Sequence, residues 1–341
     1  MNSSPAGTPT VRGNRTRAAL RTVTLAACVP YLSLKLAWLS GSRVGIPAGS
    51  ALRRDGNSLM TLNALTVLMD AAVIVLAFLL TRPWGRRVPS WLMALPMWCA
   101  TGLLAPIIVV FPVQTLFALV RGAAADGTGS AAGGPDGLLA PWVWGLVYGG
   151  FIVQGLALGT LFVLYARDRW GHLWRGRTGG LPVTPTLPAR QSAAVAAAVA
   201  AALPAAVHGL WASGQGVGLS AARLAGQDFD ARLNDAAYVL FALFTAVGVL
   251  AVGFRRGGRT PLLLPLAAAW TGSAALACWG GWMTLTTLTA TAADPRLPTP
   301  VMSLTYAVQM IVGMLVAVTG AHFLAERHAT TRAASEAARC G

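Results

Sequence analysis

Charged residues are scarce in this chain of 341 residues. Asp, Glu, Lys and Arg together make up 11% of it, whereas apolar residues make up 55%. Soluble domains usually carry about 25% charged residues, so this composition excludes a pair of ordinary soluble domains. The chain also lacks a polar stretch long enough to bury a core of its own. These two absences predict a multi-pass membrane protein.

Long apolar runs recur along the chain, each of about 20 residues, which is enough to cross a hydrocarbon core of roughly 30 Å. We place eight spans near residues 22–41, 59–81, 91–113, 140–165, 191–212, 235–254, 262–289 and 301–324. Pro96, Pro106 and Pro112 interrupt the third run. Membrane helices tolerate proline where neighbouring helices satisfy the freed carbonyl groups. The predicted fold is therefore an all-α integral membrane bundle of eight transmembrane helices.

Acidic residues and lysine are rare as well, since the net charge is +15 and Lys35 is the only lysine. With the N-terminus inside, eighteen arginines fall on one side, in the segments 12–21, 82–87, 167–190, 255–259 and 327–339, against seven on the other side. This positive-inside bias predicts that both termini are cytoplasmic. Because the arginines are dispersed over five segments, we expect anionic headgroups of a lipid bilayer as their partner, and no nucleic acid.

Signatures of catalysis and metal binding are missing. The chain contains no HExxH, no CxxC, no GxxxxGK[ST] and no GxGxxG between a strand and a helix. Three of the four cysteines lie in predicted spans and Cys340 lies in the C-terminal tail, so we expect free thiols. We predict no catalytic residues, no cofactor and no metal site. An intramembrane enzyme built from scattered residues is the less favoured alternative.

An internal repeat is present instead. The stretch "KLAWLSGSRVGI" (35–46) aligns without gaps on "HGLWASGQGVGL" (208–219), and "LNA" from Leu62 matches "LND" from Leu233. We expect two tandem four-helix repeats of the same orientation, 19–166 and 191–325. A cytoplasmic linker, 167–190, joins them; a disordered N-tail, 1–18, and a C-tail, 326–341, flank them. The alternative is that spans rich in Gly, Ala and Leu are similar by composition alone.

The aligned stretches share a motif, [K/H]xxWxxG, at the end of the first helix of each repeat. Its residues are Lys35, Trp38, Gly41 and Gly45 in the first copy and His208, Trp211, Gly214 and Gly218 in the second. In this motif the sequence resembles uncharacterised actinobacterial multi-pass membrane proteins, some of which are small and carry a single four-helix unit. The resemblance implies location in a bacterial cell (plasma) membrane and implies no activity. The strong preference for arginine over lysine is also typical of a GC-rich genome.

Six polar residues within the spans form the candidate polar intramembrane site: Lys35, Asn63, Asp70, Gln154, His208 and Gln309. Asp70 lies near the middle of the second span, where a lone carboxylate is costly. Helical spacing places Asn63 and Asp70 on one face, and we expect Asp70 to form an ion pair with Lys35. The alternative for Lys35 is that its ammonium extends to the interface.

His208 can change charge near neutral pH, or it can simply bind a backbone carbonyl. Gln154 and Gln309 are more typical of bonds between helices than of substrate binding. Buried ionisable groups within paired repeats favour a transporter-like or channel-like role for a small solute, ion or lipid. The alternative is a non-transporting membrane scaffold or sensor subunit, in which Lys35 and Asp70 only hold helices together.

Overall fold

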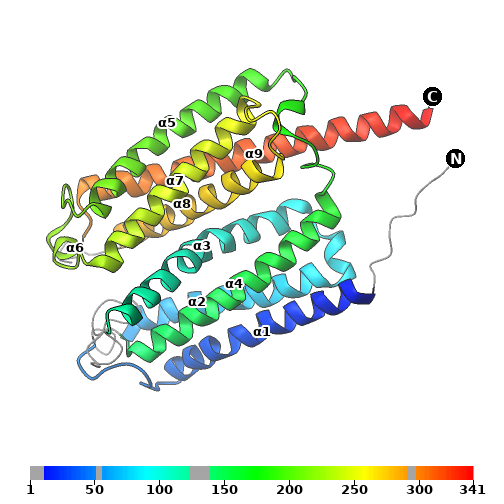
Figure 1. The fold of residues 1–341 in the computed structure, drawn as a ribbon. Coiled ribbons are helices and arrows are strands. Elements are labelled where there is room, and N and C mark those ends of the chain that lie inside the picture. Colours follow the sequence, from blue (N-terminus) through cyan, green and yellow to red (C-terminus); the bar gives the residue numbers. More distant parts are fainter. Residues whose placement is uncertain (1–10, 51–55, 123–138, 290–296, 341) are drawn as a thin grey trace. The chain divides into compact units, whose positions relative to one another are not determined.

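The computed structural model describes residues 11–50, 56–122, 139–289 and 297–340, and within these ranges the chain consists of helices and their connections (Figure 1). The helices are α1 (Val11–Leu39), α2 (Gly56–Thr81), η2 (Pro83–Arg87), α3 (Ser90–Val120), α4 (Pro141–Trp170), η3 (Thr178–Gly180), α5 (Leu187–Ala212), α6 (Ala221–Ala225), α7 (Phe229–Gly253), α8 (Leu263–Thr289) and α9 (Pro300–Cys340). No β-strand occurs in these described ranges.

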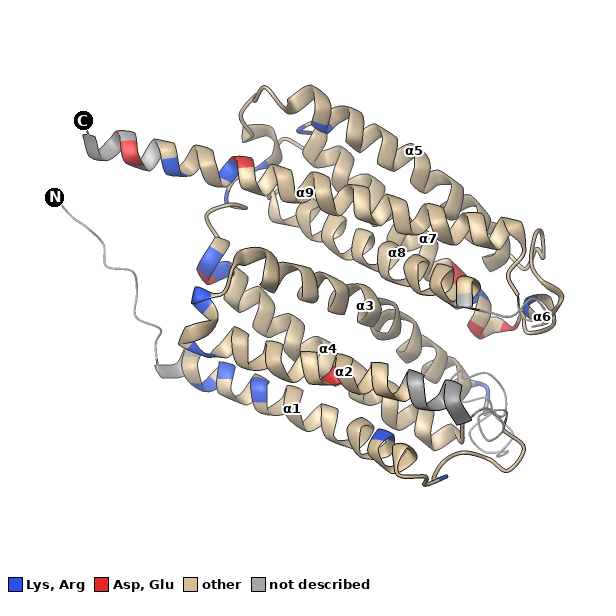
Figure 2. Ribbon diagram, turned by 180° about the vertical axis from the view of Figure 1, so that it is seen from behind, with Lys and Arg blue, Asp and Glu red and all other residues tan. Residues whose placement is uncertain are grey.

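Eight of the helices are long and apolar enough to cross a membrane: α1, α2, α3, α4, α5, α7, α8 and α9. Each of the eight expected spans lies within one of them to within two residues at its ends. The prediction of an all-helical, multi-pass membrane protein is thus confirmed. The third span is a continuous helix of 31 residues despite its three prolines. Figure 2 shows that the long helices carry few charges along their middle parts and more near their ends.

In the structure α1 begins at Val11, within the expected N-tail 1–18; residues 1–10 lie outside the described ranges. Side-chain bonds explain why the helix starts before its apolar run. Arg17 forms an ion pair with Asp168 near the end of α4. One turn later, Arg21 Nη1 donates to Thr81 Oγ1 at the end of α2, 3.2 Å away. These bonds hold the first turns of α1 against its neighbours.

The described helices divide into two compact units. The first unit contains α1, α2, α4 as far as Arg169, and both ends of α3. The second contains residues 98–116 of α3 and the chain from Trp170 onward. In the first unit, Leu34 and Trp38 of α1 pack with Val143 and Val147 of α4 around Ile46. The expected repeat and linker boundaries remain predictions.

Glycines bring the helices of the second unit close together. A Cβ atom at Gly280 of α8 would lie 2.7 Å from the carbonyl oxygen of Tyr306 on α9. A Cβ atom at Gly313 of α9 would lie 2.4 Å from the carbonyl oxygen of Ser273 on α8. Such close backbone contacts are typical of helix pairs in membranes. The hydrophobic effect does not drive helix association in lipid, and small residues let the helices pack closely. Around these helices, Phe241, Leu276 and Val312 are members of a fully buried cluster.

Candidate functional site

Lys35 lies in a buried, polar and aromatic setting in the first unit. Its Nζ donates a hydrogen bond to Asn63 Oδ1, 2.7 Å away on α2. The same ammonium lies 4.9 Å from the centroid of the Tyr31 ring and 5.0 Å from that of Trp38. An ammonium over aromatic faces is stabilised by their negative electrostatic potential, more strongly where water is excluded. Lys35 is thus buried and held inside the helix bundle.

Asp70 lies on the same helix, α2, about two turns after Asn63, and is 3% exposed. The charge of Lys35 and the amide of Gln154 are the neighbouring groups that act on its carboxylate. The direct ion pair expected between Lys35 and Asp70 is not formed in this described region, because Asn63 takes the ammonium instead. Oδ2 of Asp70 has no hydrogen-bond partner among the described residues. An unsatisfied carboxylate oxygen in an apolar bundle destabilises the fold.

Gln154 links α4 to this cluster. Its side chain is buried, and its Oε1 lies 3.6 Å from the Cys28 thiol of α1, at the limit of a weak hydrogen bond. Thr66 donates to the carbonyl oxygen of Asn63 at 3.0 Å. The structure therefore brings Lys35, Asn63, Asp70 and Gln154 together in the first unit.

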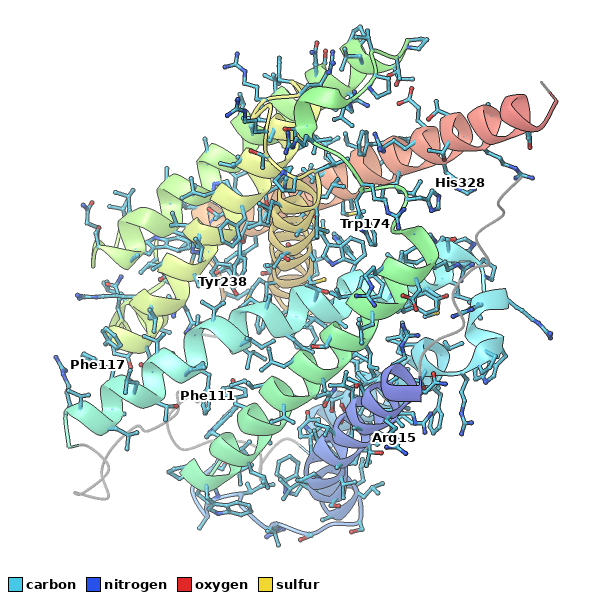
Figure 3. The ribbon with its side chains drawn as sticks, turned by 45° about the vertical axis from the view of Figure 1, so that its right-hand side comes forward. Arg15, Phe111, Phe117, Trp174, Tyr238 and His328 are labelled. Atoms are coloured by element: carbon cyan, nitrogen blue, oxygen red, sulfur yellow. The ribbon has the colours of Figure 1, made fainter. Side chains whose placement is uncertain are left out.

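His208 is the centre of a second polar cluster, in the second unit, and is 2% exposed. Its Nδ1 lies 2.9 Å from Asp235 Oδ1 on α7. Its Nε2 lies 3.0 Å from the amide nitrogen of Gln309 on α9. The ring meets that of Trp211 edge-on at 4.9 Å and that of Tyr238, labelled in Figure 3, at 4.8 Å. Of the two alternatives for His208, the contact with a backbone carbonyl is not the one found, since both ring nitrogens face side chains.

These two partners indicate which ring nitrogen of His208 carries a hydrogen. A carboxylate only accepts hydrogen bonds, so Nδ1 carries a hydrogen and donates it to Asp235. Nε2 then accepts from the amide N–H of Gln309 in the neutral imidazole. A proton added at Nε2 would convert that acceptor into a donor, and Gln309 would have to turn its amide oxygen toward the ring. The described contacts therefore fit the neutral imidazole with its hydrogen on Nδ1.

Arg223 forms an ion pair with Asp235 at the edge of the buried His208 cluster. Its Nη2 lies 3.3 Å from Asp235 Oδ2 and 3.4 Å from Oδ1. The Arg223 side chain is 35% exposed, whereas Asp235 is 2% exposed. Arg223 lies on the short helix α6, whose N-cap Ser220 accepts a hydrogen bond from the Arg223 backbone N–H. The arginine neutralises the buried carboxylate from its solvent-facing side.

Sequence reasoning missed Arg223 and Asp235. Asp235 ends the "LND" segment that was matched with "LNA", so Ala64 occupies the corresponding place in the first half. An acidic residue in one copy and an alanine in the other was the available signal. The predicted site residues thus fall into two clusters, with His208 and Gln309 in the second unit and the remaining four in the first.

The tryptophan and glycines of the motif form the same turn in both units. Gly41 and Gly214 have a φ of 91°, which favours glycine. Backbone bonds from Ser42 to Ala37 and from Gln215 to Leu210, of 2.8 and 3.0 Å, close the turn as in a Schellman motif.

The motif's indole bridges that turn. Trp38 Nε1 donates to the carbonyl oxygen of Val44 at 2.8 Å, and Trp211 Nε1 donates to that of Val217 at 2.9 Å. The tryptophan and glycines of the motif therefore stabilise the turns that end α1 and α5. Lys35 and His208 each contact the tryptophan one turn further along.

Cys28, Cys99 and Cys278 are free thiols, as expected; the side chain of Cys340 lies outside the described part of the chain. Among the described residues, no group of three or more His, Cys, Asp or Glu side chains is placed to hold a metal ion. No protein family, curated protein or solved structure matches this chain.

Proposed function

We propose that this protein is a transporter-like or channel-like protein for a small solute, ion or lipid, and that His208 is its charge-changing group. The protein would lie in the plasma membrane of a bacterium, with both termini in the cytoplasm. Most arginines would face the anionic headgroups on the cytoplasmic side of the bilayer. The observation that carries the function is the chain of side chains from part-exposed Arg223 through Asp235 to buried His208 and Gln309. Ionisable residues inside membrane bundles are rare and commonly mark ion and substrate pathways.

Two tandem four-helix repeats, 19–166 and 191–325, are the proposed architecture. The support is the pair of matching turns, in which the same positions carry the left-handed glycines, the six-residue backbone bond and the indole bond. The carbonyl oxygen of the second motif glycine is also bound in both copies at the start of the last helix. Ala140 N donates to Gly45 at 2.8 Å, and Thr299 Oγ1 donates to Gly218.

In this proposal the two repeats have different roles. Lys35 has an ammonium group whose contacts are supplied by Asn63 and two aromatic rings. His208 occupies the equivalent position, and imidazole is the side chain whose ordinary pKa is nearest neutral pH. Movement of a proton at His208, coupled to the rotation of Gln309, would supply two states of the second unit, which alternating access requires.

A non-transporting scaffold or sensor subunit is the second candidate. The observation that favours it is the completeness of the Lys35 contacts, since a lysine bound by an amide and two aromatic rings can serve as a clamp between α1 and α2. In that case both clusters hold helices together and neither handles a proton.

Proton flux into proteoliposomes, followed with an internal pH-sensitive dye, distinguishes these candidates. Under an imposed pH gradient and a potassium-valinomycin potential, the protein should admit protons faster than empty vesicles do. His208→Gln should abolish this flux, and Asp235→Asn should reduce it. His322→Gln, which removes an exposed imidazole from α9, is the matched control and should keep full flux. Flux equal to that of empty vesicles, or full flux in H208Q, would reject the proton role and favour the scaffold.

A further inference from the structure

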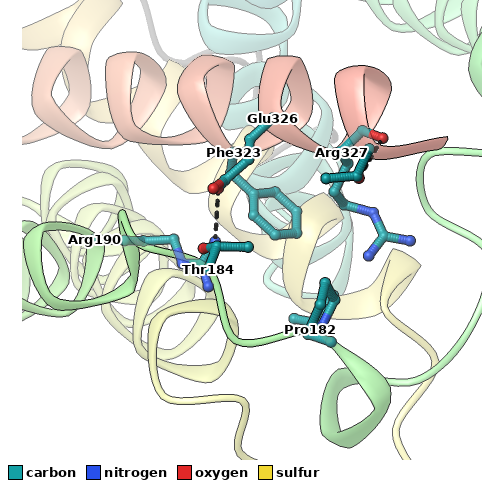
Figure 4. A pocket seen from close by; sticks show the side chains of 8 residues that line it. Pro182, Thr184, Arg190, Phe323, Glu326 and Arg327 are labelled. Carbon is teal, nitrogen blue, oxygen red and sulfur yellow. Dashed lines mark hydrogen bonds and ion pairs between the residues drawn. The ribbon is translucent and has the colours of Figure 1, made fainter. Parts of the chain in front are cut away.

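A small pocket opens in the second unit where the first turns of α5 and the later turns of α9 meet the segment before α5 (Figure 4). Its lining combines apolar, hydroxyl and charged side chains: Leu181, Pro182, Thr184, Arg190, Phe323, Glu326, Arg327 and Thr330. Glu326 is the one acidic residue of this lining, which also holds two arginines, and it forms an ion pair with Arg190. The pocket shares no residue with the His208 cluster and is not used by the proposed function.

Arg190 is the lining side chain whose buried hydrogen-bond donors are unsatisfied. It is 8% exposed, and neither its Nε nor its Nη2 has a hydrogen-bond partner among the described residues. Only Nη1 faces a counter-charge, Glu326 Oε2, at 3.6 Å, which is beyond hydrogen-bond distance. A guanidinium carries five N–H donors in a planar fork. Three of them, one on Nε and two on Nη2, are therefore buried without an acceptor, which is costly unless a ligand supplies one.

Glu326 is only a partial counter-ion, because it lies 3.6 Å from Arg190 Nη1 and its carboxylate also accepts the hydroxyl hydrogen of Thr186. Thr186 Oγ1 lies 2.8 Å from Oε1 and 2.9 Å from Oε2. The guanidinium groups of Arg190 and Arg327 lie 5.1 and 5.9 Å from the centroid of the Phe323 ring. Arg255 adds another positive charge that acts on Arg190. Positive charge thus exceeds negative charge in and around the pocket.

We infer that this pocket binds a phosphate-bearing anion, with Arg190 as the principal ligand. Phosphate oxygens match the fork of a guanidinium and accept more than one of its N–H bonds at once. Arg190 is in the first turn of α5, at the end of a membrane span, the depth at which lipid headgroups lie. Leu181, Pro182 and Phe323 offer apolar contact to a glycerol backbone. Basic pockets between transmembrane helices at this depth bind anionic headgroups, and free inorganic phosphate has the same chemistry.

The experiment counts bound phosphatidylglycerol by native mass spectrometry on the full chain, released from nanodiscs of phosphatidylcholine with about one tenth phosphatidylglycerol. A parallel arm measures thermal stabilisation of the detergent-solubilised protein by inorganic phosphate. Arg190→Gln should weaken anion binding about tenfold, the effect of losing one charge-assisted pair of hydrogen bonds. Glu326→Gln should strengthen it, since the competing carboxylate is removed. Arg332→Gln, which changes an exposed arginine of α9, is the matched control and should leave binding unchanged.

Each outcome decides the inference. Retention of phosphatidylglycerol that R190Q lowers and E326Q raises supports a lipid site. Stabilisation by inorganic phosphate with the same variant pattern, without preference for phosphatidylglycerol, supports a site for free phosphate. The inference is overturned if folded R190Q binds both anions as the parent does, or if the parent binds neither. E326Q retains Arg190, so its opposite effect tests the site even if R190Q fails to fold. None of these results depends on transport.

Discussion

His208 Nδ1 lies 2.9 Å from Asp235 Oδ1, and both residues are 2% exposed within an apolar helix bundle. Removing the carboxylate leaves the histidine N–H without its acceptor and Arg223 without its counter-ion. We expect Asp235→Ala to lower the free energy of unfolding by about 3 kcal/mol, as when one partner of a buried pair is lost. The fraction unfolded by SDS in mixed micelles, titrated for parent and variant, measures this.

The matched comparison is Asp168→Ala, which removes the part-exposed partner of Arg17. Its cost should be less than about 1 kcal/mol, because solvent screens such a pair. Equal costs at the two positions would contradict the importance given to the His208 cluster.

The indole bond of Trp211 makes a second prediction. Trp211→Phe keeps most of the ring but removes the N–H that binds the Val217 carbonyl oxygen. The buried carbonyl then lacks its donor, and we expect a loss of about 1 to 2 kcal/mol of unfolding free energy. Trp38→Phe should cost a similar amount, since Trp38 makes the same bond to Val44. Trp91→Phe is the control, because Trp91 is exposed, and its unfolding transition should coincide with that of the parent.

Asp70 provides a prediction of opposite sign. Because its Oδ2 is unsatisfied among the described residues, replacing Asp70 with leucine should leave the first unit equally stable or more stable, by up to about 2 kcal/mol. If the carboxylate serves transport, the same Asp70→Leu variant should lose flux while gaining thermal stability, a trade-off typical of functional sites. Unchanged flux in the stabilised variant, alone or combined with Lys35→Met, would make the first cluster a structural clamp.

His172, in the connection after α4, predicts a dependence of stability on pH. Burial lowers the pKa of His172, and the nearby positive charges of His328, Arg175 and Arg327 lower it further. The folded state therefore holds the proton less tightly than the unfolded state, and stability falls as the pH drops below about 6.5, the ordinary histidine pKa. His172→Gln should reduce the fall in Tm between about pH 7 and pH 5. If the slope is the same with and without the imidazole, the neighbouring charges do not act on it.

The spans could be predicted because a bilayer of fixed thickness demands runs of apolar residues of fixed length. The shared faces of Tyr31, Lys35 and Trp38, and of Asn63 and Asp70, could be predicted from helical spacing. The partner of Lys35 could not, because the choice between Asn63 and Asp70 depends on the axial offset of α2 against α1, which no periodicity encodes. In the same way, the contact of Arg223 with Asp235 depends on how α6 turns back toward α7, and that turn is set by tertiary packing.

Gly280 and Gly313 have one more consequence. Where two backbones touch, no layer of side chains lies between them that could change rotamers and allow sliding. We therefore expect α8 and α9 to rotate or translate together, and Gln309, only four residues from Gly313, to move with them. Any motion that separates Gln309 from His208 has to occur between this rigid pair and α5. A spin label on α5 paired with one on α9 should show two distance populations, whereas labels on α8 and α9 should show one.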